Sequence, residues 1–238
     1  MQLDNYYGAK NGSGVYQAIV NLIPPHDTFI DGFLGTGAIL KRKAPAIRDI
    51  GIDLYKPCIE GFSYTAIEHN KFHKGIFQYD PNRFKLLNTD IFKYLAKFDF
   101  IRNGRVCLYL DPPYVKSTRT STMKYPCDFT DRDHINLLNL ALNLNCYILI
   151  SGYRNSIYKK LIGHWWSYDF QAMTRGGVRT ETVWCNFLPK DVHYHTYAGV
   201  NFTDRQRIER KALGWAKKFE KLPAGERQAI IAALLSVE

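Results

Sequence analysis

The most restrictive feature of this 238-residue sequence is an apolar run that ends in an acid and two prolines. Residues 106–110, Val-Cys-Leu-Tyr-Leu, lead directly into Asp111-Pro112-Pro113-Tyr114. An apolar run of this length is typical of a buried strand, and the strand must end here because proline has no amide donor for a sheet. We therefore expect Asp111 at the carboxyl end of a strand, which is the edge where open α/β sheets bind their ligands.

This tetrapeptide offers two hydrogen-bond acceptors next to a flat ring. Asp111 contributes carboxylate oxygens, and the Pro112 carbonyl is left without a ladder partner because Pro113 lacks an N–H. Tyr114 contributes an aromatic face. Two acceptors beside a ring suit an exocyclic amino group on a stacked base. The alternative interpretation of these residues is an ordinary strand-end turn with a capping aspartate.

A second constraint is a glycine-rich turn between a short strand and a helix. Residues 28–30 form the expected strand, Asp31-Gly32-Phe33-Leu34-Gly35-Thr36-Gly37 forms the turn, and a helix is expected from residue 38. Glycines in such a turn let the backbone approach a ligand closely at the helix N-terminus. The spacing is neither the dinucleotide fingerprint nor a phosphate-binding loop. The pattern predicts a nucleotide-type α/β fold.

Single acids follow or end three of the expected strands. Asp53 ends the strand at 49–53, Asp90 ends the strand at 84–90, and Asp111 follows the third. A carboxylate at the tip of the second strand is where a ribose diol is commonly held, although a turn cap is an equally good reading of Asp53 alone. The regular placement of these acids favours a shared functional site.

The remaining elements complete the expected fold. Tyr6 and Lys10 open the chain before a helix at 15–23, and Lys10 taken alone looks like an ordinary solvated lysine. An amphipathic helix starts at residue 131, with His134 expected on its surface. Further strands are expected at 147–150 and 182–187. The predicted fold class is α/β, with a Rossmann-like, mostly parallel central sheet.

The charge balance indicates an anionic partner. The chain holds 32 Lys and Arg against 22 Asp and Glu, a net charge of +10, which favours nucleic acid before membrane. Residues 115–126 are basic and rich in hydroxyls, so they form either a solvated loop or an element that touches phosphates. A basic turn is expected at 175–179. The candidate nucleic-acid contacts are Lys116, Arg119, Lys124, Tyr125, Arg175 and Arg179.

Composition also bounds compartment and domain organisation. The first residues do not resemble a signal peptide, and no apolar run reaches the roughly 20 residues that span a bilayer, so we expect a cytoplasmic protein. The five cysteines show no C-x-x-C spacing, and neither a metal site nor a disulfide framework is predicted. We expect a main domain over 1–190 and a basic helical extension over 191–238.

In combination, these motifs resemble the alpha-type N6-adenine DNA methyltransferases, the Dam-like and phage- or prophage-encoded enzymes. The likeness covers roughly residues 5–187 and rests on the order of the lysine-bearing start, the Phe-x-Gly-x-Gly turn and Asp-Pro-Pro-Tyr. It implies a class I methyltransferase fold and transfer of a methyl group from S-adenosylmethionine to adenine N6. It also implies a target base flipped out of double-stranded DNA.

The resemblance assigns roles to individual residues. Tyr6 and Lys10 would contribute to the cofactor pocket, and Asp53 would hold the ribose. Asp111 and the Pro112 carbonyl would accept hydrogen bonds from the target amino group, next to Pro113, while Tyr114 would stack on the base. The other residues implied in cofactor binding are Asp31, Phe33, Gly35, Gly37 and Asp90.

Two departures from the family pattern bear on specificity. Family members usually carry Glu-Pro where this chain has Asp31-Gly32, so the acid is kept and the proline is lost. Only 57 residues separate Asp53 from Asp111, where larger members insert a target recognition domain. The insert is therefore reduced or absent, and a short or relaxed target is expected.

Two other functions fit the same residues. One is an RNA methyltransferase that modifies adenine or another amino group, since a basic surface suits either polymer. The other is a non-catalytic nucleic-acid-binding protein on a methyltransferase fold, which the intact Asp111, Pro112 and Tyr114 argue against. The sequence leaves the oligomeric state open between a monomer and a weak dimer.

Overall fold

The computed structural model describes residues 10–12, 14–63, 84–119, 126–174, 177–189 and 197–236. Short helices alternate with strands through the first part of the chain, and two longer helices follow. The strands are β1 Thr28–Asp31, β2 Arg48–Asp53, β3 Phe84–Asn88, β4 Val106–Leu110, β5 Tyr147–Gly152, β6 Trp166–Thr174 and β7 Gly177–Cys185. The helices are α1 Val15–Val20, α2 Ala38–Arg42, α3 Lys56–Glu60, α4 Ile91–Leu95, the 3₁₀ turn η5 Lys116–Thr118, α5 Asp131–Leu142, α6 Ser156–Ile162, α7 Phe202–Glu220 and α8 Ala224–Leu235.

The seven strands form one sheet in the order β3-β2-β1-β4-β5-β7-β6. Pairing is parallel from β3 through β5, and β7 then runs antiparallel to both β5 and β6. Parallel strands joined by helices give the doubly wound arrangement that strand, turn and helix signals predict. The expected Rossmann-like class I methyltransferase fold is thereby confirmed.

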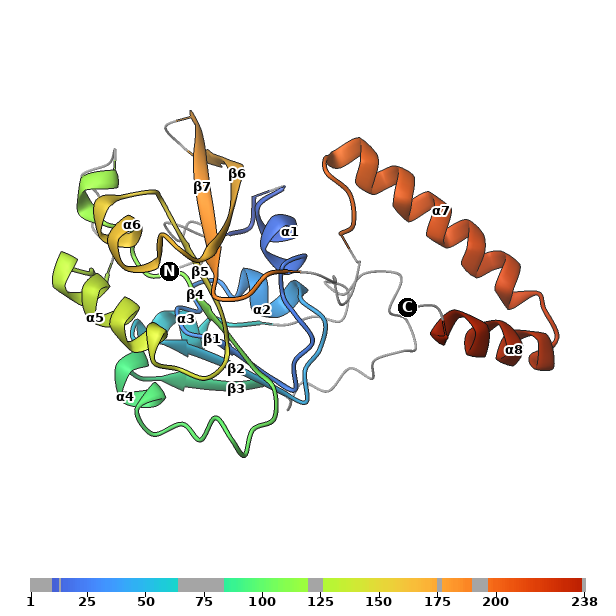
Figure 1. Ribbon diagram of the computed structural model, residues 1–238, viewed down its shortest axis with the longest axis horizontal. Helices are drawn as coiled ribbons and strands as arrows, with labels where there is room; N and C mark the ends of the chain where they lie inside the picture. The colour runs from blue at the N-terminus through green and yellow to red at the C-terminus, as the bar shows by residue number, and fades with distance from the viewer. Residues whose placement is uncertain are drawn as a thin grey trace. The chain divides into compact units, whose positions relative to one another are not determined.

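Helices cover both faces of the sheet. In Figure 1, α4, α5 and α6 lie on one side of the strands, whereas α1 and α2 lie on the other. The core on the first side joins the strand residues Ile30 and Leu108 to Leu137 and Leu138 of α5 and Ile162 of α6, all buried. Strands buried on both faces read as continuous apolar runs, which explains why residues 106–110 are apolar without alternation.

The strand order sets the position of the functional edge. Strand β1 pairs with β2 on one side and with β4 on the other, so the connections from β1 and to β4 diverge at this point. A ligand crevice forms outside the carboxyl ends of the strands where the order reverses in this way. Asp31 ends β1, Asp53 ends β2, and Asp111 directly follows β4.

Some sequence-based expectations about the late part of the chain are wrong. Strand β6 was not predicted, although it pairs with β7 along its whole length. The basic turn expected at 175–179 does not extend to Arg179, which lies in β7. His134 is not a surface residue: it is fully buried on the inner face of α5, where Leu137 and Leu138 follow at helical spacing.

The last part of the chain forms a separate compact unit. The chain forms two compact units, Met1–His195 and Thr196–Glu238, and the second unit contains α7 and α8. Helix α7 is capped by Asn201, whose side chain accepts the Asp204 N–H, and none of its residues is buried. The domain boundary after residue 190 stays a prediction. Within the described part of the chain, no helix is both long and apolar enough to cross a membrane.

Candidate active site

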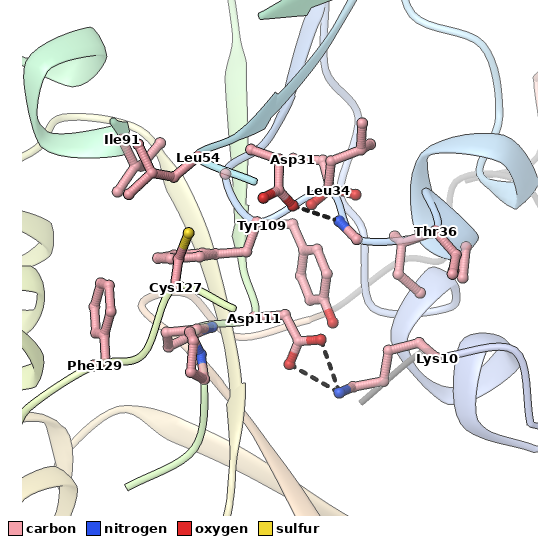
Figure 2. Close-up of a pocket in the computed structure, with 18 of the residues that line it drawn as sticks. Lys10, Asp31, Leu34, Thr36, Leu54, Ile91, Tyr109, Asp111, Cys127 and Phe129 are labelled. Carbon is pink, nitrogen blue, oxygen red and sulfur yellow. Dashed lines mark hydrogen bonds and ion pairs between the residues drawn. The ribbon is translucent and has the colours of Figure 1, made fainter. Parts of the chain in front are cut away.

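A pocket lies at the carboxyl edge of the sheet and collects most of the predicted cofactor and catalytic residues. Lys10, residues of the glycine turn and the ends of β2 and β4 line it, and Figure 2 shows Lys10 joined to Asp111. The predicted residues that line it are Lys10, Asp31, Phe33, Gly35, Asp53, Asp90, Asp111, Pro112, Pro113 and Tyr114. Gly37 is not part of the lining, and it forms the N-cap of α2 behind the turn.

Lys10 binds the residues that follow β4. Its ammonium lies 2.8 Å from each carboxylate oxygen of Asp111 and also donates to the Tyr114 hydroxyl. Lys10 is only 5% exposed, so the expectation of a solvated lysine is wrong. Burial raises the pKa of Asp111 to about 6, and Lys10 partly opposes that rise. The carboxylate is therefore poised to ionise near neutral pH.

The glycine turn is held by Asp53 and leaves little room for side chains. One Asp53 oxygen accepts the Gly35 N–H and the other accepts the Tyr55 N–H, both at 2.8 Å. At Gly32, where the family carries proline, a Cβ would come within 2.9 Å of Leu110 and Ile91. At Gly37 the backbone φ is +71°, a conformation that favours glycine. The turn is therefore shaped by these glycines and by Asp53.

Asp31 is the most deeply perturbed acid of the pocket. Burial, followed by the nearby charges of Asp111 and Asp53, raises its pKa to about 8. Its Oδ1 atom has no hydrogen-bond partner among the described residues. A buried acid in this state is costly unless a ligand compensates it. Asp31 is therefore placed to meet a donor or a cation in the pocket.

The opposite end of the pocket is apolar. Leu54, Ile91 and Phe129 line it on the side away from Lys10 (Figure 2). Phe129 packs edge to face against Phe33, which joins this apolar end to the glycine turn. Asp90 caps α4 by accepting the Lys93 N–H and borders the same end. A flat ring with a polar edge would fit between these groups.

Sequence reasoning missed Glu181, which joins the acidic end of the site from β7. The Tyr114 hydroxyl donates to its Oε2 at 2.9 Å, and Lys10 lies 3.6 Å from the same atom. Glu181 is 6% exposed. A carboxylate directly before the expected strand at 182–187 was the available signal, because a charge that enters a buried strand usually has a partner.

The predicted nucleic-acid contacts do not line this pocket. Lys116 is exposed and lies 3.8 Å from Asp128. Arg119 donates to the Tyr114 carbonyl and to Asp128, so its guanidinium is engaged within the chain. Arg179 stacks on Tyr153 and donates to the Thr118 carbonyl. Nucleic-acid binding by Lys116, Arg119 and Arg179 stays a prediction. The other predicted site residues, Tyr6, Lys124, Tyr125 and Arg175, lie outside the described residues.

Part of the chain matches a known protein family. Residues 65–180, just under half of the chain, match the family described as D12 class N6 adenine-specific DNA methyltransferase. The matched segment contains Asp-Pro-Pro-Tyr and ends one residue before Glu181. No curated protein matches the sequence.

Two solved structures illustrate the likeness in fold. One is TYW2 of P. horikoshii in complex with MeSAdo, with 10% identity, a TM-score of 0.43, and coverage of 76% of this chain and 64% of that one. The other is an rRNA methylase from Streptococcus thermophilus, with 8% identity, a TM-score of 0.37, and coverage of 71% and 92%.

The family match confirms the resemblance to N6-adenine DNA methyltransferases, and that resemblance implies S-adenosylmethionine as the cofactor. The chain is thus a methyltransferase, and over residues 65–180 it is similar to the D12 class of N6 adenine-specific DNA methyltransferases.

Proposed function

We propose that this protein transfers a methyl group from S-adenosylmethionine to N6 of adenine in DNA. The observation that carries the proposal is the position of Asp111. Its carboxylate shares one pocket with the glycine turn and Asp53, and it is followed at once by Pro112 and Tyr114. An acceptor for an amino group therefore lies beside a site suited to a nucleoside.

The charges of the pocket fit the cofactor. Asp31, Asp53 and Asp111 line it, and Lys10 is the one basic side chain among its described lining residues. These acids outnumber the one basic side chain, and a ligand with positive charge would favour their ionised forms. S-adenosylmethionine carries a sulfonium and an ammonium group. The apolar end at Leu54 and Phe129 would take its adenine, beside Asp90. When bound, the cofactor supplies an electrophilic methyl group.

Asp111 has two tasks in this proposal. The lone pair of an aromatic amino group is delocalised into the ring, so the nitrogen is a poor nucleophile. Hydrogen bonds from its N–H groups to Asp111 and to the Pro112 carbonyl would orient the nitrogen toward the methyl group. Once the methyl group is transferred, an Asp111 oxygen would take the surplus proton from N6. A pKa of about 6 leaves Asp111 ionised above that pH and able to accept it.

Tyr114 would form the wall of the target pocket. Its hydroxyl is fixed by Lys10 and Glu181, and Tyr153 packs edge to face against its ring at 4.6 Å between centroids. Because the hydroxyl and the ring of Tyr114 are both held by neighbours, the side chain loses little conformational entropy when a flipped base stacks on it. The neighbouring Arg179 lies 3.9 Å above the Tyr153 ring and extends the wall with positive charge.

A shallow groove continues from this wall along the surface. Thr118, Arg154 and Thr180 border it together with Tyr153 and Arg179. Hydroxyl and guanidinium groups are typical phosphate contacts, which position a nucleic acid without reading its sequence. Because only 57 residues separate Asp53 from Asp111, there is little room for a target recognition insert, and we expect a short or relaxed DNA target.

The proposal is tested by expressing the protein in a host that lacks adenine methylation. We expect N6-methyladenine in the host DNA by mass spectrometry, with positions mapped by long-read sequencing, and none with Asp111→Ala. Methylation found only in RNA would favour the RNA methyltransferase. Nucleic-acid binding without methyl transfer to either polymer would favour the non-catalytic protein. A mapped site of six or more fixed bases would contradict the relaxed target.

A further inference from the structure

Lys10 occupies the atoms that the target amino group needs. Its ammonium lies 2.8 Å from both carboxylate oxygens of Asp111. In the proposed reaction, Asp111 must accept a hydrogen bond from adenine N6 in the same place. A lysine that keeps both oxygens competes with that donor for position and for negative charge. A shift of Lys10 away from one oxygen would leave that oxygen, and more of the negative charge, to the amino group.

A second carboxylate is already next to Lys10. Glu181 Oε2 lies 3.6 Å from the ammonium, so a movement of less than about 1 Å would give the usual length of a charge-assisted hydrogen bond. Glu181 comes from β7, whereas Asp111 follows β4, so the two acids approach Lys10 from different parts of the sheet. Lys10 thus lies within reach of two alternative acids.

Burial makes such a second partner necessary. Lys10 is 5% exposed and Glu181 is 6% exposed, so neither charge is well solvated. A buried ammonium that lost its carboxylate would face a large desolvation penalty. The Tyr114 hydroxyl, which accepts from Lys10 and donates to Glu181, connects the two groups and keeps them in line.

We propose that Glu181 is a positioning residue that receives the Lys10 ammonium when a target amino group takes over Asp111. In this arrangement Glu181 also keeps the Tyr114 hydroxyl fixed while the base enters. The inference rests on the proposed function of the same site, and it assigns to β7 a role that the motifs of the sequence do not contain.

A double-mutant cycle tests the coupling between Glu181 and Lys10. Glu181→Gln keeps the size of the side chain and an acceptor for the Tyr114 hydroxyl, but it removes the charge. We expect Glu181→Gln to raise KM for DNA and to lower the single-turnover rate, together by about tenfold or more, with cofactor Kd changed less than twofold. Lys10→Met should then cost clearly less in the Glu181→Gln background than in the wild-type protein.

Two further variants guard against a merely structural explanation. Glu181→Asp retains the charge and should therefore keep most of the wild-type activity, in contrast to Glu181→Gln. This comparison still tests the charge at residue 181 if Glu181→Gln folds poorly. Glu60→Gln removes the same charge from an exposed pair with Lys56 and should change nothing. Circular dichroism and the melting temperature report the folding of each variant.

The outcomes separate this inference from the proposed function. If the wild-type protein methylates DNA but the effects of Lys10→Met and Glu181→Gln simply multiply, the role of Glu181 is wrong and the function stands. Wild-type rates in Glu181→Gln, or no rescue by Glu181→Asp, would also overturn it. If the wild-type protein methylates no nucleic acid, the proposed function fails and this inference falls with it.

Discussion

Strands β1 and β2 each have an aspartate near both ends, and the two edges of the sheet compensate these acids differently. At the amino edge, Arg105 hydrogen-bonds to Asp27 and lowers its pKa to about 2, and Lys43 forms an ion pair with the fully buried Asp49. At the carboxyl edge, burial raises the pKa of Asp31 to about 8 and also raises that of Asp53. The aspartates at the two edges therefore differ in whether a basic side chain pairs with them, although each lies near the end of a strand.

This difference separates acids that support the fold from acids that serve a ligand. The lowered pKa of Asp27 stabilises the folded state above about pH 4, and this stability is lost as the pH falls toward 2. The raised pKa of Asp31 has the opposite sign. Between about pH 4 and pH 8 the acid ionises in the unfolded chain but stays protonated in the folded protein, so the stability of the fold falls as the pH rises through this range. A buried acid that lowers the stability of the fold in this way is typical of a functional site, where a bound cation can offset the loss.

The largest effect is expected at Asp111. Asp111→Ala removes both the orienting acceptor and the proton acceptor, so the single-turnover rate of methyl transfer should fall by about 10²–10⁴-fold. Cofactor affinity should change much less, and the melting temperature should hold, because Lys10 keeps Glu181 and the Tyr114 hydroxyl as partners. Rapid-quench assays with labelled cofactor measure the rate. A near-parental rate would remove Asp111 from the chemistry.

At the amino edge, Asp49→Ala should damage stability and leave the chemistry intact. It removes the carboxylate from the buried Lys43 ammonium, and breaking such a pair costs about 3–5 kcal/mol. Urea unfolding measures the loss. Combining Lys43→Met with Asp49→Leu should restore part of it, since a buried pair is often replaceable by apolar side chains. If Asp49→Ala lowered the free energy of unfolding by less than about 1 kcal/mol, the acids of the amino edge would not be the ones that support the fold.

At the carboxyl edge, Asp53→Ala should weaken cofactor binding by about 1.5–3 kcal/mol, the scale of hydrogen bonds to a charged group. Titration calorimetry with S-adenosylmethionine measures the affinity. Because Asp53 also holds the N–H groups of Gly35 and Tyr55, Asp53→Asn serves as the control that retains one acceptor. Unchanged affinity in Asp53→Ala would exclude Asp53 from the cofactor site.

A smaller effect is expected for exposed cations near each edge. If Lys116 contacts a phosphate, Lys116→Ala should reduce the log–log salt slope of DNA binding by about 0.9. Arg102 is similarly exposed but precedes β4 at the amino edge, so Arg102→Ala should leave the slope unchanged. Binding measured by fluorescence anisotropy over a range of salt concentrations gives both slopes. Equal slopes for the two variants would place the nucleic acid elsewhere.

Much of the carboxyl edge is predictable because its signals are local. Strand β4 coincides with the apolar run at 106–110, and the turn that begins at Asp31 is marked by its glycines. The strand-end positions of Asp53 and Asp111 follow from proline and from strand length. Parallel pairing then brings these acids to one edge whatever the details of the helices.

The contacts that complete the site are not local. Lys10 meets Asp111 across 101 residues of sequence, and Tyr114 meets Glu181 across 67. The local pattern around Lys10 does not distinguish it from a solvated lysine, and only the resemblance to a family with a lysine-bearing start places it in the pocket. The burial of His134 was readable from its helical spacing with Leu137. For Glu181 the sequence indicates only that the carboxylate needs a partner, whereas the identity of that partner depends on the pairing between β5 and β7.

The most direct test of the contrast between the two edges is the proton balance of cofactor binding at pH 7. Calorimetry in two buffers of different ionisation enthalpy counts the protons released. Because burial raises the pKa of Asp31 to about 8, a cation bound beside it should displace a proton at this pH, on the order of one. Asp31→Asn should abolish that release, whereas Asp27→Asn should retain it. Equal proton release by the wild-type protein and Asp31→Asn would contradict the account.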